Sequence, residues 1–176
     1  MREPPPPYAG EGPHALWHVS EEDSIRRFEP RDGRVWAVAT RLLPLYWFPR
    51  DCPRATFWAE SRTTEPDVDR FLGGDRARRV HVVEPVSAER MRTERVVAYR
   101  MPEETFVEND DRFWISAEPV EPIELVELGD LVARHEAAKI ELHTEDDLLG
   151  LWDQVIASSL GYSGIRLRNA VSAGNQ

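Results

Sequence analysis

The sequence predicts an α+β fold, because many short strand-like segments are followed by helical patterns late in the chain. From residue 15 onward, segments rich in Val, Ile, Trp, Phe and Tyr alternate with polar turns, which is typical of short strands. The clearest helical pattern lies near the C-terminus, over residues 144–160. The 176 residues, 41% of them hydrophobic, suffice for one domain with its own core.

The expected elements follow from these patterns in order. Strands are expected at 15–20, 35–40, 54–60, 78–85, 95–102, 112–116 and 123–128. Short helices are expected at 65–73 and at 129–138, the second with Asp130 as its cap. Thr144 is expected to begin the helix over 144–160, whose apolar residues recur on one face.

The first residues have a different composition. Four prolines at 4–7 are followed by Gly10, Gly12 and Pro13, and such a segment can neither form a helix nor join a sheet. We therefore expect a disordered or extended arm over 1–14 and a single domain over 15–176.

Charge and composition exclude several classes of function. The net charge of -10 argues against an extended nucleic-acid surface, which requires an excess of Lys and Arg. The sequence has no apolar run long enough to span a membrane, and its first residues lack the order of a secretory signal. A cytoplasmic protein is therefore expected.

Metal and thiol sites have little support in the sequence. Cys52 is the only cysteine, so neither an internal disulfide nor a thiolate metal cluster is expected. The histidines have no metal-binding spacing, and no Gly-rich phosphate loop or Gly-x-Ser-x-Gly motif occurs.

His18 is the first candidate site residue. Strand alternation places His18 and Ser20 on one face, opposite Trp17 and Val19. Two interpretations stay open, an ordinary partly exposed histidine or a ligand-binding group at the end of the strand.

The segment after the second expected strand carries further candidates. That strand leads into Thr40, then into an aromatic stretch with Tyr46, and then into a proline-rich loop that presents Arg50 and Arg54. Guanidinium groups in a rigid loop suit phosphate or carboxylate ligands. An ion pair of Asp51 with one of these arginines is the alternative.

Glu118 and Glu121 are the candidate acidic residues. Each precedes a proline near the entry of a late strand, a position from which a carboxylate can point into a cleft. The neighbouring glutamates alternate with apolar residues and fit a solvated strand face.

Four segments resemble a small family of uncharacterised bacterial proteins with no assigned function. The segments are LWHVSEEDSIRRFEPR at 16–31, VWA at 35–37, PRDCPR at 49–54 and GIRLRNA at 164–170.

A remote resemblance is more informative about function. A strand with His-x-Ser, a strand leading to an aromatic segment with Tyr46, and a late strand entry with Glu118 are similar in order to the His, Tyr, Glu pattern of the ADP-ribosyltransferase superfamily. The layout is closest to that of the rifampicin ADP-ribosyltransferases. The resemblance implies a split β-sheet sandwich with helices on its flanks and a C-terminal helix, NAD as substrate, and no metal.

The resemblance also implies roles for single residues. His18 and Ser20 would hold the adenosine-side ribose, Tyr46 would stack on nicotinamide, and Glu118 would support the nicotinamide ribose. Thr40, Arg50 and Arg54 complete the set expected to bind the cofactor. The superfamily often has Gly after the histidine, where this chain has Val19.

The sequence leaves several functions open, including whether the protein is an enzyme. ADP-ribose transfer from NAD to an unknown acceptor is the first. A non-catalytic nucleotide- or anion-binding protein, using Arg50, Arg54 and either Arg166 or Arg168, is the second. The third is a protein-interaction module, which could also act as a homodimer. The fourth is an RNA 2'-phosphotransferase.

Overall fold

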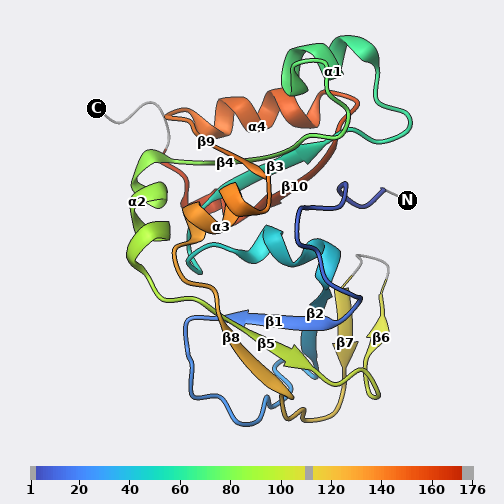
Figure 1. The fold of residues 1–176 in the computed structure, drawn as a ribbon, viewed down its shortest axis with the longest axis vertical. Helices are drawn as coiled ribbons and strands as arrows, with labels where there is room; N and C mark the ends of the chain where they lie inside the picture. The colour runs from blue at the N-terminus through green and yellow to red at the C-terminus, as the bar shows by residue number, and fades with distance from the viewer. Residues whose placement is uncertain (1–2, 110–112, 172–176) are drawn as a thin grey trace. The chain divides into compact units, whose positions relative to one another are not determined.

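The structure, a computed structural model, describes residues 3–109 and 113–171 (Figure 1). It comprises two compact units, each with its own sheet and core. Unit 1 consists of the described residues of Met1–Gly10, Phe48–Glu94 and Asp130–Gln176, and unit 2 consists of those of Glu11–Trp47 and Arg95–Gly129. Mixed helices and mainly antiparallel sheets confirm the predicted α+β class.

Unit 2 is built on an antiparallel sheet. Its strands, within the described residues, are β1 (Leu16–Ser20), β2 (Val35–Ala39), β5 (Val97–Met101), β6 (Val107–Glu108), β7 (Phe113–Ser116) and β8 (Glu124–Glu127). Their order across the sheet is β6-β7-β2-β1-β5-β8. A 3-10 helix, η1 (Thr40–Tyr46), follows β2 directly.

The core of unit 2 lies on one face of this sheet. Leu16, Ala37 and Val97 point to that face by strand alternation and are fully buried. The same cluster includes residues outside the strands, among them Phe28 and Val120. Their backbones form a bridge with N···O distances of 2.7 and 2.9 Å, so the loop after β1 is fixed to the segment before β8.

Unit 1 contains a mixed sheet. Its strands are β3 (Arg54–Trp58), β4 (Arg79–Val83), β9 (Glu141–Thr144) and β10 (Gly161–Ile165), in the order β10-β3-β4-β9 within the described chain. Only the β4–β9 pair of these is parallel. The helices are α1 (Glu65–Leu72), α2 (Pro85–Thr93), α3 (Leu131–Ala137), α4 (Leu148–Ile156) and the 3-10 helix η2 (Leu167–Asn169).

The apolar core of unit 1 lies between its sheet and two helices. Ala55, Phe57, Val80 and Val82 share one sheet face by alternation, and α1 and α4 cover that face (Figure 1). Among the helices formed by residues 3–109 and 113–171, none has the length and apolar character to cross a membrane.

The last predicted helix is shorter than expected. Thr144 does not begin it but lies in β9, opposite Val83. Asp147 is the cap instead, since its side chain accepts a hydrogen bond from Gly150 N at 2.9 Å. The prediction that Thr144 begins the helix was wrong because residues 141–144 form an edge strand that pairs with β4. The other expected strands and helices are present, and Asp130 caps α3 as predicted.

Gly161 in β10 allows two neighbouring side chains to pack closely. A Cβ at this position would lie 2.5 Å from Trp58 Nε1 and 2.9 Å from Glu60 Cγ. Because Trp58 is almost completely buried, Gly161→Ala is expected to lower the free energy of unfolding by about 1–3 kcal/mol. Urea unfolding measures this, with Gly12→Ala, whose Cβ meets no atom within 4 Å, as the neutral control. Equal stability of the two variants would contradict the packing described here.

Candidate functional site

His18 lies where β1 and β2 separate. The two strands pair at Leu16↔Ala39 and Trp17↔Val38, and β1 then continues along β5 alone as far as Ser20. His18 Nδ1 donates a hydrogen bond to the Trp36 carbonyl oxygen at 2.8 Å. The side chain therefore bonds a β2 carbonyl just beyond Trp17↔Val38, where the β1–β2 register ends.

Aromatic rings surround His18 in a connected group, which we call the His18 ring cluster: His18, Phe28, Trp36, Tyr46 and Phe113. The His18 ring centroid lies 4.7 Å from that of Phe28 and 4.6 Å from that of Trp36. Trp36 in turn lies 5.5 Å from Tyr46. The structure thus connects His18 and Tyr46, two predicted site residues, through one tryptophan.

The hydrogen bond to Trp36 fixes the tautomer of His18. A carbonyl oxygen only accepts, so Nδ1 carries the hydrogen. In the neutral ring Nε2 is then an acceptor. His18, Trp36 and Tyr46 are only half-buried, so a ligand can reach this edge of the cluster.

The loop with the candidate carboxylates is attached to the same cluster. Val120 pairs with Phe28, whose ring contacts His18. Glu118 and Glu121 are both exposed on either side of this bridge. Ser116 Oγ accepts from Glu118 N at 3.1 Å, which helps to hold the backbone of the loop.

A hollow of about 460 Å³ lies on unit 2 beside the core residue Tyr99. Tyr99 is the register partner of His18 on β5. The remaining walls come from two segments, 23–26 and 122–125. Unit 2 therefore has solvent-accessible space next to the strand that pairs with the His18 strand.

Ser20 is the last residue of β1, whereas Thr40, the first residue of η1, is bonded to Ala15 just before β1 begins. Thr40 Oγ1 accepts from Ala15 N at 3.0 Å and from Trp17 Nε1 at 3.1 Å, and it donates to Pro13 O at 3.0 Å. A hydroxyl has one hydrogen and two lone pairs, so these bonds use its whole capacity. The geometry favours a structural role for Thr40, and its predicted cofactor contact stays a prediction.

Arg50 and Arg54 belong to unit 1 and have different environments. Arg50 is exposed, whereas Arg54 is buried. Arg54 Nη1 donates to Cys52 O at 3.0 Å, and its guanidinium carbon lies 4.8 Å from the centre of the Phe48 ring. Arg54 thus packs inside unit 1, and a ligand contact by either arginine stays a prediction.

Sequence reasoning missed a buried polar chain in unit 1. Arg79 Nε donates to His81 Nε2 at 3.1 Å. His81 Nδ1 and His135 Nε2 lie 2.9 Å apart, and His135 Nδ1 donates to Leu131 O at 2.6 Å. The carbonyl at one end and the guanidinium at the other determine both tautomers, so His81 donates to His135. The four groups connect β4 to α3.

Burial keeps both imidazoles neutral. It lowers the pKa of His81 well below 6.5, and the charges of Arg79 and Arg54 lower it further. Burial likewise lowers the pKa of His135 to about 4, against the opposing effect of its bond to Leu131. The only sequence signal was the alternation that places Arg79 and His81 on one strand face. Both nitrogens of each imidazole form hydrogen bonds within this buried series of four groups, which indicates a structural role.

Cys52 is expected to react slowly in the folded protein. It is fully buried, and burial raises the pKa of its thiol, so little thiolate forms at neutral pH. Thiol titration with a chromogenic disulfide at pH 8 is expected to detect almost no reaction within minutes and one thiol per chain in 8 M urea. Fast reaction of the folded protein would contradict the buried position.

Comparison with known proteins identifies a family but no activity. Residues 17–170 match a protein-family model described as a family of unknown function (DUF6886). No curated protein and no solved structure matches the chain. The matched region contains the His18 ring cluster, both candidate glutamates and the buried His81–His135 chain. The chain belongs to the DUF6886 family of unknown function.

Proposed function

We propose that the His18 ring cluster binds NAD or a related nucleotide and that the protein transfers ADP-ribose from it to an acceptor. The observation that carries the proposal is that the Trp36 ring connects His18 to Tyr46, and that all three side chains are half-buried. A ribose hydroxyl forms hydrogen bonds with imidazole nitrogens, and a nicotinamide ring stacks on an aromatic face. His18 and Ser20 hold the ribose, and Tyr46 stacks on nicotinamide.

The chemistry requires a carboxylate near the second ribose. The bond between the ribose carbon and the nicotinamide nitrogen breaks, and its electron pair leaves with nicotinamide. The ribosyl cation that develops is stabilised by a nearby carboxylate and captured by an acceptor nucleophile that loses a proton. Glu118 is assigned this role, with Glu121 as the alternative, because their loop is bonded to Phe28 at the edge of the cluster.

A ligand titration with a parallel product assay tests this function. Thermal unfolding of the purified protein is followed with NAD, ADP-ribose, nicotinamide and inorganic phosphate, and released nicotinamide is measured by chromatography. We expect stabilisation by NAD and ADP-ribose, and slow release of nicotinamide from NAD that is lost in Glu118→Gln. If neither nucleotide stabilises the protein, the proposal is wrong.

A second function is favoured by arginines at one end of the unit 1 sheet. Arg54 is the register partner of Ile165, which directly precedes Arg166. Asn169 Nδ2 donates to Asp51 O at 2.9 Å, so the segment with Arg168 is bonded to the loop with Arg50. A non-catalytic anion-binding protein would use this cationic end.

This alternative makes a different prediction in the same titration. Phosphate and ADP-ribose would stabilise the protein without release of nicotinamide, and Arg166→Ala or Arg168→Ala would remove the effect. Replacement of His18 would leave it unchanged.

A further inference from the structure

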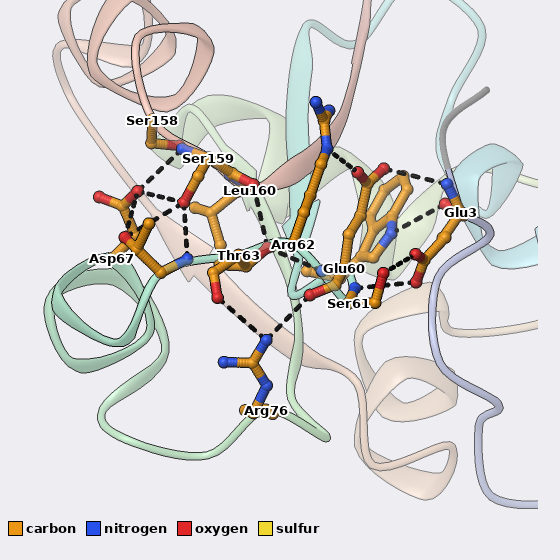
Figure 2. Close-up of polar contacts among 12 residues, drawn as sticks. Glu3, Glu60, Ser61, Arg62, Thr63, Asp67, Arg76, Ser158, Ser159 and Leu160 are labelled. Atoms are coloured by element: carbon orange, nitrogen blue, oxygen red, sulfur yellow. Dashed lines mark hydrogen bonds and ion pairs between the residues drawn. The ribbon is translucent and has the colours of Figure 1, made fainter.

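The N-terminal arm binds to unit 1 through Glu3 (Figure 2). Its carboxylate accepts from Ser61 N at 2.9 Å and from the Ser61 hydroxyl. Its backbone oxygen accepts from Trp58 Nε1 at 3.2 Å, and its backbone nitrogen donates to Glu60 Oε1 at 3.1 Å. Every polar group of this one residue is therefore recognised by residues 58–61.

Two of the receiving residues, Trp58 and Glu60, also make contacts that do not involve the arm. The Glu60 side chain is only 1% exposed and pairs with Arg62 Nε at 2.8 Å. Glu60 N donates to Thr63 Oγ1 at 2.8 Å, and Glu60 O accepts from Arg76 Nη2 at 2.9 Å. Trp58 packs over Gly161, which leaves no room for a Cβ. Trp58 and Glu60 are thus positioned by unit 1 itself, which lowers the cost of ordering them for a peptide.

The site also has the charge to select an acidic residue. The pKa of the Glu3 carboxyl lies below its ordinary value because of the two Ser61 hydrogen bonds, with a smaller effect of the Arg62 charge. The ionised form is therefore the one that is bound. A neutral amide at this position would lose the attraction to Arg62.

The prolines that follow Glu3 continue along unit 1. Residues 3–8 have neither helix nor strand, and Pro5 is buried. Further along, Ala9 N donates to Ala138 O at 2.9 Å. Proline-rich segments lose little conformational entropy on binding, and an indole N–H that donates to a backbone carbonyl beside prolines is a recurring way to recognise them.

We infer that this site, formed by Trp58, Glu60, Ser61 and Arg62, is a docking site for an extended peptide of a partner protein in which an acidic residue precedes prolines. Residues 3–9 are the ligand that the chain itself supplies. Because an attached segment competes at a high effective concentration, the partner peptide binds only when the arm leaves. The inference concerns unit 1 and does not depend on nucleotide binding by unit 2.

A peptide titration of the full chain tests the inference. In Glu3→Arg the arm loses its carboxylate and places a cation near Arg62, so the arm should leave the docking site. Glu104→Arg, an exposed position of unit 2, has the same change of charge and is the matched control. A synthetic peptide of residues 1–10 is added to each chain, and NMR follows the Trp58 indole N–H and the Ser61 amide.

We expect saturable shifts of both signals in Glu3→Arg, at peptide concentrations at least ten-fold below those that the control requires. The same peptide with Gln in place of Glu3 should bind at least five-fold more weakly. Absence of saturable shifts in Glu3→Arg, or identical titrations of the two chains, would overturn the inference.

Discussion

His18→Asn is expected to abolish stabilisation by NAD and ADP-ribose while the protein stays folded. Asparagine Nδ2 occupies nearly the same position as histidine Nδ1, so the bond to Trp36 O can persist. The acceptor at Nε2 is lost, as are the ring contacts with Phe28 and Trp36. Ring contacts of this kind contribute about 0.5–1.5 kcal/mol each, so a modest loss of stability is expected.

Two further substitutions separate binding from packing. His18→Gln places its amide at the Nε2 position, so the bond to Trp36 O is lost, and His18→Ala removes both groups. Each is expected to lower the free energy of unfolding by about 1–2 kcal/mol, because a part-buried carbonyl loses its donor together with the ring contacts.

Thermal unfolding with and without NAD measures both effects. His143→Asn, at an exposed histidine of unit 1, is the control and should bind like the unchanged protein. If NAD stabilises the His18→Asn protein as fully as the unchanged protein, His18 packs against its neighbours and bonds Trp36 O but does not bind the nucleotide.

Acid is expected to destabilise the protein through His135. The folded pKa of about 4 lies below the ordinary 6.5, so between these values the unfolded chain binds a proton that the folded chain does not. The stabilisation by neutral His135 is therefore complete above pH 6.5 and is lost as the pH falls toward 4. The difference corresponds to roughly 3 kcal/mol.

The charges around the two rings all act in the same direction. Arg79 and Arg54 face His81, and Arg79 and Arg134 lower the pKa of His135. Protonation would thus add a positive charge to a buried group of cations.

His135→Gln separates this effect from general acid denaturation. Its side-chain oxygen can still accept from His81 Nδ1, while the bond to Leu131 O is lost. At pH 7.5 the variant should be less stable by about 1–2 kcal/mol. Urea unfolding at pH 7.5, 6 and 5 is expected to show this difference shrinking as the pH falls. A constant difference would mean that the pKa of His135 is the same in the folded and the unfolded chain.

Residue composition was sufficient for strands that are buried along their whole length. The strands expected at 54–60 and 78–85 were predicted because apolar and β-branched residues dominate them, and β3 and β4 lie within these ranges. Residues 141–143 were assigned to no element and Thr144 to the following helix, because a four-residue edge strand has too few residues for a period and its parallel partner lies some 60 positions earlier.

The candidate site was predictable only in part. His18 stood out because it shares one face of the first expected strand with Ser20, and Tyr46 because an aromatic stretch follows the second expected strand. Trp36 looked like an ordinary strand residue, although it contacts both rings. The arm over 1–14 was expected from proline content alone, and no local signal indicated that Glu3 binds Ser61, since that contact spans 58 positions.

The sequence by itself determined the α+β class, most of the strands and the type of residue available for a site, because these depend on local periodicity and on composition. Only the tertiary structure decided which of those residues meet. Three features depend on groups that are distant in sequence. They are the hydrogen bond between His81 and His135, the bond of His18 to Trp36 where β1 and β2 separate, and the binding of Glu3 by residues 58–61. Such contacts form when sheet register and helix packing bring those groups within hydrogen-bonding distance, and no local pattern encodes that distance.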